Sequence, residues 1–222
     1  MKTNLKIIML GASGAVGGFA AHELCGSPDI KQLTLLNRRV LATFANNPKV
    51  VQPTVDVLNP LSYAHFLSGH DTAVCCLGVG EPSKASKEEF IKIDKTAVLD
   101  FATACKLAGV RHFQLLSSVG ANATSRSFYL RTKGELQNAI IALGFERTSF
   151  FQPSMIVTPT NRYGPLQGIV LAVWPALSTV MVGGLRKFRG INVETLGRAI
   201  AKNTLTTGQG VEIVQWDDIN AI

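Results

Sequence analysis

The sequence predicts an α/β fold in which a parallel sheet is covered by helices on both faces. Short apolar runs alternate along most of the chain with segments that have a helical pattern. The first run ends in a cluster of glycines that opens a helix, and conspicuous polar residues follow several later runs. Such alternation is typical of βαβ units, so we expect a doubly wound parallel sheet whose ligand lies beyond the carboxyl ends of the strands.

Length and composition indicate a single compact domain. The 222 residues are 46% hydrophobic and 17% charged, which suits a well-buried core and excludes a disordered or fibrous chain. We expect one domain over residues 1–222. Within it we expect a nucleotide-binding core over about 1–157 and a small C-terminal cap, 158–222, on the substrate side.

Cysteine usage and charge exclude several classes of protein. None of the four cysteines forms a CxxC pair and the four histidines are scattered, so we expect no metal site. No secretory segment is evident, and a reducing cytoplasm is the location that we expect. The net charge is +7, but the basic residues are dispersed without a run of five, which argues against nucleic acid as a partner.

Six strands are predicted from apolar runs that are bounded by glycine, proline or polar residues. Residues 5–10 (LKIIML) and 71–78 (DTAVCCLG) are dominated by apolar side chains, as expected of strands buried on both faces. Residues 50–57 form a weaker strand because Pro53 lacks a backbone donor. The remaining strands are predicted at residues 32–37, 110–118 and 146–157.

Helices are predicted between these strands. One follows the glycine cluster, a second covers residues 60–69, and a long helix over 87–108 is interrupted near Lys92. A further helix over 127–144 ends at a glycine, which favours the end of a helix. Beyond residue 158 the pattern is irregular, and we expect this part to cover the binding edge of the sheet and to shape a substrate pocket.

Residues 164–185 carry no charge and are numerous enough to cross a bilayer. Against a membrane span, Pro175 interrupts the segment, and glycines and hydroxyl side chains dilute it. We therefore expect no span, but a buried or half-buried helix near residues 167–174 that Pro175 ends. A contact with a membrane surface or with a second copy of the chain is the alternative interpretation.

Gly11, Gly14 and Gly17 form a GxxGxxG pattern directly after the first strand. Glycines there permit a tight turn and let backbone N–H groups approach a pyrophosphate, which the N-terminus of the following helix also attracts. The pattern differs by one residue from the usual dinucleotide fingerprint, and a glycine-rich turn without a ligand is the alternative. In its strand–turn–helix context we expect the pattern to bind a nucleotide.

Asn37, Arg38 and Arg39 follow the second strand, where such folds contact the adenosine ribose. A carboxylate there would favour NAD, but residues 30–55 contain no Asp or Glu. Arginine can instead pair with a 2′-phosphate, so we expect NADP(H) to be preferred over NAD(H). The alternative is that both arginines are solvated surface residues.

Tyr129 and Lys133 are four residues apart and share one face of the predicted helix 127–144. Ser117 and Ser118 end the preceding strand, so the hydroxyls, the phenol and the ammonium would meet at one edge of the sheet. Reduction of a carbonyl by hydride builds charge on oxygen, which a proton donor must neutralise. A tyrosine beside a lysine can supply the proton, and a serine hydroxyl can orient the oxygen. The alternative is a chance pair on a helix with serines that merely end a strand.

The segments GASGAVGG, LLNRR, CCLG, LLSSVGA and YLRTK resemble, in this order, motifs of the short-chain dehydrogenase/reductase superfamily. Over about residues 5–205 the chain is similar to an atypical, NmrA-like group that contains the Tat-interacting oxidoreductase-like proteins. The resemblance implies an NADP(H)-binding Rossmann fold and catalytic roles for Ser118, Tyr129 and Lys133. It also implies that the backbone near Pro153 contacts the nicotinamide carboxamide.

The residues that carry these motifs, with two at the end of the third strand, are the expected cofactor site. They are Gly11, Ser13, Gly14, Ala15, Val16, Gly17, Asn37, Arg38, Arg39, Asp56, Val57, Leu77, Gly78, Ser117 and Pro153. Asp94, in the long helix, either lines this site or is an exposed helix carboxylate. The chain departs from the family where Gln152-Pro153-Ser154 stands in place of Arg-Pro-Gly and where the interval from Ser118 to Tyr129 is short.

Three functions follow from these observations. The first is NADP(H)-dependent reduction of a small carbonyl substrate, with Tyr129 as the acid. The second is a non-catalytic NADP(H)-binding sensor that acts through a homodimer or a protein partner, since atypical members of the resembling group include such proteins. The third is epimerase or dehydratase chemistry on a sugar nucleotide, for which the chain looks short.

Overall fold

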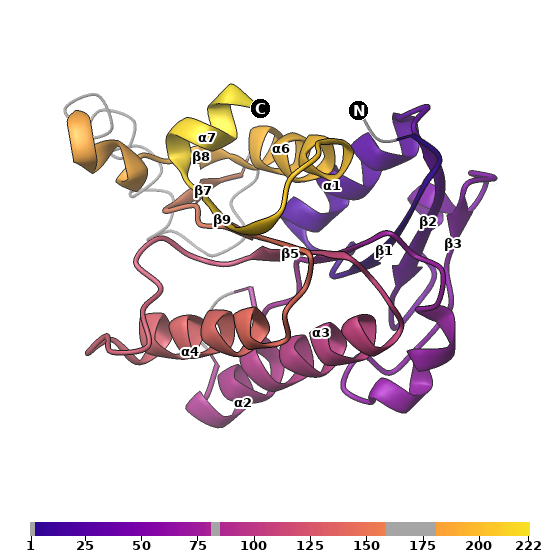
Figure 1. The fold of residues 1–222 in the computed structure, drawn as a ribbon, viewed down its shortest axis with the longest axis horizontal. Coiled ribbons are helices and arrows are strands. Elements are labelled where there is room, and N and C mark those ends of the chain that lie inside the picture. The colour runs from indigo at the N-terminus through magenta and orange to yellow at the C-terminus, as the bar shows by residue number, and fades with distance from the viewer. Residues whose placement is uncertain (1–2, 81–84, 159–180) are drawn as a thin grey trace.

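A computed structural model describes residues 3–80, 85–158 and 181–222 of the chain. Its centre is a seven-stranded sheet in the order β3-β2-β1-β4-β5-β6-β9, and every neighbouring pair is parallel (Figure 1). The first six positions follow the order 3-2-1-4-5-6 of dinucleotide-binding folds. The doubly wound parallel sheet predicted from the sequence is therefore confirmed.

The central strands are continuous apolar runs because both faces of the sheet are covered. Ile7, Ile8, Met9 and Leu10 of β1 are all fully buried. The strands of the sheet are β1 (Leu5–Leu10), β2 (Ile30–Leu36), β3 (Val50–Val51), β4 (Thr72–Cys75), β5 (His112–Leu116), β6 (Arg147–Phe151) and β9 (Gly210–Val214). A separate parallel pair consists of β7 (Ile156–Val157) and β8 (Ile191–Asn192).

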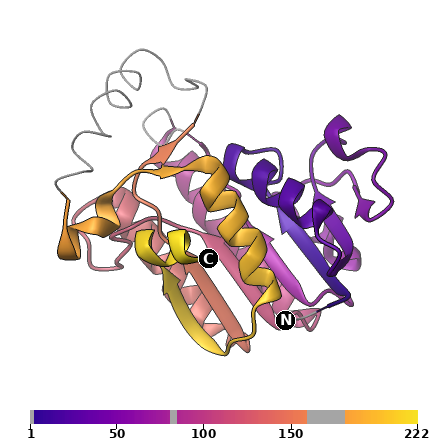
Figure 2. The same cartoon turned by 90° about the horizontal axis from the view of Figure 1, so that it is seen from above.

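Helices form a layer on each face of the sheet, as Figures 1 and 2 show. The helices of the upper layer in Figure 1 are α1 (Ala15–Gly26), α6 (Val193–Leu205) and α7 (Trp216–Ala221). Those of the lower layer are α2 (Lys87–Ile91), α3 (Ala97–Leu107) and α4 (Phe128–Ala142). Viewed from above in Figure 2, α1 and α6 cross the same face of the sheet side by side.

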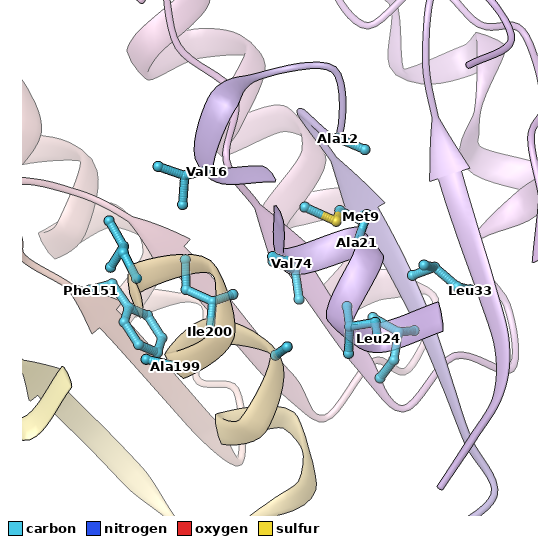
Figure 3. Close-up of a cluster of buried hydrophobic side chains, with 14 of the residues drawn as sticks. Met9, Ala12, Val16, Ala21, Leu24, Leu33, Val74, Phe151, Ala199 and Ile200 are labelled. Carbon is cyan, nitrogen blue, oxygen red and sulfur yellow. The ribbon is translucent and has the colours of Figure 1, made fainter. Parts of the chain in front are cut away.

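The core between the sheet and the α1–α6 layer is drawn in Figure 3. Side chains of α1 and α6, among them Leu24 and Ile200, point toward strand residues such as Met9 and Val74. The two helices approach closely because α6 carries Gly197, where an added Cβ would lie 2.6 Å from the Cβ of Phe19. This contact fixes Phe19 and Ala20 of α1 against α6, and α1 begins directly after Gly14 of the glycine motif.

The C-terminal part of the chain differs from the expectation. We expected residues 158–222 to cover the binding edge of the sheet, but α6 packs on α1 and β9 extends the sheet beside β6. The helix has a detectable signal, since Val193, Leu196 and Ile200 are buried at helical spacing. The sequence of β9 gives little indication of a strand, because the strand is stabilised by pairing with β6, which is far away in the sequence.

Several other elements are shorter or more irregular than predicted. The strand expected at 50–57 is reduced to β3 and a single bridge between Asn37 and Thr54, consistent with Pro53 between them. The helix expected at 60–69 consists of two 3₁₀ turns, Pro60–Ser62 and Ala64–Phe66. The interruption predicted near Lys92 is a π-helical segment, Lys92–Thr96, that joins α2 to α3.

The helix expected near residues 167–174 lies outside the described residues. In the ranges that the structure describes, no helix is both long and apolar enough to cross a bilayer.

Candidate functional site

The residues singled out from the sequence meet at the carboxyl edge of the sheet. Gly11 directly follows β1, Asn37 follows β2, Leu77 and Gly78 lie shortly after β4, and Ser117 follows β5. Two cavities open along this edge, of about 500 Å³ and about 450 Å³. They share four lining residues, so they form one continuous, two-lobed site. The shared residues are Gly14, Cys76, Leu77 and Gly78.

The glycine turn leaves no room for side chains at two of its positions. Gly11 has φ +93°, and a Cβ there would lie 2.5 Å from the backbone carbon of Cys76. A Cβ on Gly17 would lie 2.1 Å from the carbonyl oxygen of Gly11. The Gly14 N–H donates to that same carbonyl oxygen at 3.1 Å, and α1 begins at the next residue. The turn therefore brings bare backbone and a helix N-terminus to the cavity, which is what a phosphate needs.

The first lobe, of about 500 Å³, lies between the glycine turn and the ends of β2 and β4. Arg38 lines it and is exposed, so its guanidinium can reach an anionic group in the lobe. Asn37 also lines it but is only 5% exposed, and among the described residues its side-chain Nδ2 has no hydrogen-bond partner. Asp56 and Val57 complete the predicted set here, with the Asp56 carboxylate accepting from the Leu58 N–H at 2.9 Å. Arg39 is absent from this lining within the described part of the chain.

The second lobe contains the tyrosine and lysine of the motif. Tyr129 and Lys133 both line it from α4, and Ser117 lines it from the end of β5. The helix that carries the pair starts at Ser127, whose side chain accepts from the Leu130 N–H at 3.5 Å. Gly134 lets the preceding loop lie against α4, since a Cβ there would come within 2.2 Å of the Ala123 nitrogen.

Lys133 is buried in this lobe and is paired with a carboxylate. Its ammonium lies 2.9 Å from Asp94 Oδ1, and the two side chains are 6% and 5% exposed. Asp94 lines the lobe from the π-helical segment, so of the two readings open in the sequence the buried one is correct. Phe90 packs on both members of the motif, with its ring 5.4 Å from the Tyr129 ring and 6.0 Å from the Lys133 Nζ.

The two serines differ in their surroundings. Ser117 is buried, and its Oγ accepts from Gln137 Nε2 at 2.6 Å, so its own O–H is available to another acceptor. Ser118 is partly buried and its hydroxyl donates to the Val119 carbonyl at 3.4 Å. Neither Ser118 nor Pro153 lines either lobe among the residues that the structure describes. The serine that faces the second lobe is thus Ser117, one position before the one that the resemblance implies.

Ser117 is held by a chain of hydrogen bonds between glutamine side chains. Gln137 Oε1 accepts from Gln152 Nε2 at 3.2 Å, and Gln152 Oε1 accepts from Gln215 Nε2 at 3.0 Å. Gln152 stands where the resembling family often has arginine. At the position where the family often has arginine, this chain therefore places an uncharged side chain that hydrogen-bonds to Gln137 within α4.

The thiol pKa values of two neighbouring cysteines at the site are raised. Cys76 lines both lobes, and burial raises its thiol pKa well above the ordinary value. Burial likewise raises the pKa of the adjacent Cys75 to about 12. Since the thiolate is the nucleophile and the metal ligand, this shift disfavours the reactive form of both cysteines. In the described ranges no group of three or more His, Cys, Asp or Glu gathers as a metal site would require.

Sequence reasoning missed several lining residues. Glu89 and Ile93 reach the first lobe from α2 and the π-helical segment, at the i, i+4 spacing of one helix face. The further residues missed in the first lobe are Leu36, Cys76, Leu58 and Val79. Those missed in the second lobe are Cys76, Gly80, Leu116, Ile156 and Thr158. Most of these are apolar residues or glycine. They line the cavity because of where the fold places them, and no motif in the sequence indicates it.

Comparisons with known proteins agree with this geometry. A family model described as NAD(P)H-binding matches residues 11–145. The chain is 32% identical to Protein HTATIP2 of Rattus norvegicus over 93% of this chain and 84% of that one. It is 33% identical to Protein FMP52, mitochondrial, of Debaryomyces hansenii over 93% and 92% of the two chains. In structure it is similar to MoeE5 in complex with UDP-glucuronic acid and NAD, with a TM-score of 0.71 and 18% identity over 94% of this chain and 75% of that one.

The expectation of a cytoplasmic location is contradicted by these relatives. The FMP52 protein of Debaryomyces hansenii and other relatives with that name are called mitochondrial. The expectation rested on unpaired cysteines, which indicate a reducing environment but do not distinguish one reducing compartment from another.

The glycine turn, the two-lobed cavity, the strand order and the matched relatives lead to the same assignment. The chain belongs to the NAD(P)H-binding family and has the Rossmann fold of the atypical short-chain dehydrogenases/reductases.

Proposed function

We propose that this protein is an NADP(H)-dependent oxidoreductase that reduces a small carbonyl substrate. The observation that carries the proposal is the second lobe, in which Tyr129, Lys133 and Ser117 line a cavity of about 450 Å³. That lobe joins the glycine turn through Gly14 and Leu77, so a dinucleotide bound on the turn would extend into it. Bound NADPH would supply a hydride there.

The residues of the lobe can supply what hydride addition to a carbonyl requires. When hydride adds to the carbonyl carbon, the C=O π electrons move to oxygen, and the phenol of Tyr129 donates its proton to that oxygen. Lys133 brings hydrogen-bond donors to the same lobe, and the Phe90 ring packs against both Tyr129 and Lys133. A serine hydroxyl donates to the substrate oxygen and orients it.

Ser118 remains the serine that the family resemblance implies, while the lining of the lobe favours Ser117. Ser117→Ala and Ser118→Ala separate the two, because each removes one hydroxyl and leaves the other. The variant that lacks the orienting hydroxyl should lose kcat by about 10²-fold, the usual effect of removing such a donor. The other variant should keep nearly wild-type turnover.

The proposed preference for NADP(H) rests on Arg38. Its exposed side chain lines the first lobe, and no carboxylate occurs at the end of β2 to bind the ribose hydroxyls in its place. A charge-assisted hydrogen bond to a 2′-phosphate contributes about 1.5–3 kcal/mol, which corresponds to an affinity ratio of about 10- to 150-fold.

The test is a pair of measurements on the purified protein. Calorimetric titration with NADPH and with NADH should give tighter binding of NADPH. A carbonyl screen should then find turnover that Tyr129→Phe lowers by about 10²- to 10⁴-fold without a matching loss of NADPH affinity. Unchanged turnover in Tyr129→Phe would refute the role of the phenol, and equal affinity for both nucleotides would refute the preference.

A second candidate function is a nucleotide-binding protein that acts through a partner. The observation that favours it is the turn Gly183–Phe188 with the residue before it, where Val182 and Leu185 are 67% and 56% exposed beside Arg186 and Lys187. Apolar residues so exposed are suited to contact a second copy of the chain or another protein. The test is to measure the molecular mass of the protein in solution with and without NADPH. A mass that changes with NADPH, in a protein that reduces no carbonyl, would favour this function.

A further inference from the structure

The hydrogen bonds that lead to Ser117 all point in one direction. Gln137 Nε2 donates to Ser117 Oγ at 2.6 Å, and Gln137 Oε1 accepts from Gln152 Nε2 at 3.2 Å. Gln152 Oε1 in turn accepts from Gln215 Nε2 at 3.0 Å. Each side-chain amide therefore donates toward the second lobe and accepts from the far side. Ser117, Gln137 and Gln152 are buried, so water does not compete for these groups.

A backbone group fixes this direction. Gln215 is the N-cap of α7, and its side-chain oxygen accepts from the backbone N–H of Asp218. An N–H group can only donate, so the Gln215 amide cannot turn over without losing this bond, and its Nε2 must face Gln152. Gln152 then has to present Oε1 to Gln215 and Nε2 to Gln137, and the same condition passes on to Gln137. The helix cap thus sets the orientation of three side-chain amides.

The direction of the chain decides what Ser117 can offer a ligand. A hydroxyl has one donor and two acceptor positions, and Gln137 occupies one of the acceptor positions. The Ser117 O–H is left to donate into the lobe that Ser117 lines. A carbonyl oxygen on which negative charge develops needs such a donor. In a chain that ran the other way, Gln137 would accept the Ser117 proton, and the lobe would receive no donor from this serine.

Ser118 has a different arrangement. Its hydroxyl donates to the Val119 carbonyl at 3.4 Å, so its proton is directed to the backbone. Hydrogen bonds that follow one another in the same direction polarise and strengthen one another. Because glutamine is uncharged, the chain behind Ser117 can do this without placing an unpaired ion in the interior.

We propose that Gln215, Gln152 and Gln137 are positioning residues, which together fix Ser117 as a hydrogen-bond donor to the oxygen of the substrate. The inference rests on the proposed function and deepens it, because it selects Ser117 as the orienting serine. Glutamines with a purely structural role would affect stability according to the number of hydrogen bonds lost. Glutamines that fix a direction must also lower turnover when the direction is reversed, even where few bonds are lost.

Gln215→Glu reverses the chain from its far end. The glutamate keeps an oxygen that accepts from the Asp218 N–H, but a second oxygen replaces Nε2, and Gln152 can bond to that oxygen only through its own Nε2. Gln152 and Gln137 then turn over in succession, and Gln137 presents its oxygen to the Ser117 O–H. With the carbonyl found in the screen, this variant should lose kcat by about 10²-fold, as Ser117→Ala should. NADPH affinity should not change.

Two variants serve as controls in the same assay and in thermal unfolding. Gln215→Ala loses the bond to Gln152 and the cap, but leaves the other amides free to keep their direction. It should have a lower Tm than Gln215→Glu and yet a higher kcat, the reverse of what a structural role predicts. Asn220→Asp makes the same change from amide to carboxylate in the same helix, at an exposed residue that bonds to the Trp216 carbonyl outside the chain. It should leave kcat unchanged.

A change at Gln137 tests the last step independently of the cap. Gln137→Glu keeps an oxygen that accepts from Gln152 and replaces the donor to Ser117 by a group that can ionise. The ionised carboxylate accepts the Ser117 proton, whereas the protonated acid can donate to Ser117 Oγ as glutamine does. The ratio of its kcat to that of the wild type should fall as pH rises through the pKa of this carboxyl, which burial holds above its ordinary value of about 4.3. A ratio that is independent of pH would overturn the proposal.

Side-chain NMR detects the direction of the chain without turnover. The amide N–H signals of Gln137, identified by their loss in Gln137→Met, should shift in Gln215→Glu and stay in place in Asn220→Asp. Gln215 is only partly buried, so its variants decide the outcome even if Gln137→Glu does not fold.

Failure of the proposed function has a different signature. If the wild type reduces no carbonyl in the screen, the oxidoreductase proposal fails, while the Gln137 signals still decide the direction of the chain. If the wild type turns over and Gln215→Glu keeps as much of kcat as Gln215→Ala, or if the Gln137 signals do not shift, only the positioning of Ser117 by the glutamines is refuted.

Discussion

Substitution of Gly17 by alanine tests the link between the glycine turn and nucleotide binding. The added Cβ would lie 2.1 Å from the Gly11 carbonyl oxygen, whereas an ordinary carbon–oxygen contact is about 3.3–3.6 Å. The turn would therefore have to move by about 1 Å or more. That oxygen also accepts from the Gly14 N–H at 3.1 Å, so the movement disturbs the hydrogen bond that closes the turn.

The expected cost follows from these distances. Overpacking at a site walled by backbone costs about 1–3 kcal/mol, and replacing glycine by alanine in a helix returns about 0.5–1 kcal/mol. The two ranges leave a net loss of up to about 2.5 kcal/mol, which corresponds to a fall in Tm of up to about 10 °C for a chain of this size. NADPH affinity should fall as well, because the displaced N–H groups no longer converge on the pyrophosphate.

Gly18→Ala is the matched control in the next position of the same helix. Its Cβ would lie 3.5 Å from the Ala12 carbonyl oxygen, which is an ordinary contact. This variant should be as stable as the wild type or more so, with unchanged NADPH affinity. Thermal unfolding and calorimetric titration of both variants check the reasoning. Equal Tm and equal NADPH affinity in Gly17→Ala and Gly18→Ala would refute it.

Three further outcomes are expected. Arg38→Ala should bring NADPH affinity down to that for NADH, while Arg39→Ala, which lies outside the described lining, should change it less; titration of both nucleotides checks this. Burial lowers the pKa of His70, so stability should fall as pH drops below 6.5, the ordinary value, and His70→Gln should lack this part of the pH dependence of urea unfolding. Arg147→Met removes a buried guanidinium bonded to Glu212, Asn203 and Thr206 and should destabilise by about 3 kcal/mol. Arg111→Met removes an exposed partner of Asp71 and should cost less than about 1 kcal/mol in the same assay.

The fold could be predicted because its main signals are local. Each apolar run and the turn that follows it are contiguous in the sequence, and parallel strands joined by helices have few alternative arrangements. The glycine turn and the Tyr129–Lys133 pair are also local, so their place at the carboxyl edge follows once the strands are known. The strand order and the shared cavity agree with these predictions.

The features that escaped prediction depend on contacts between distant residues. The strand β9 pairs with β6 across an interval of more than fifty residues, and its own sequence alternates weakly. The two serines are adjacent, and only packing against Gln137 from α4 distinguishes Ser117 from Ser118. No local pattern encodes such choices.

By itself the sequence determined the order of the elements up to β6, the glycine turn and many of the residues at the edge of the sheet, since short-range spacing and strand topology are enough to specify them. Only the tertiary structure decided that Asp94 is buried against Lys133 and that residues 191–214 complete the sheet and its upper helical layer. The physical reason is the same in both cases. The energy of a buried ion pair or of a paired edge strand depends on partners that the chain brings together only when it folds.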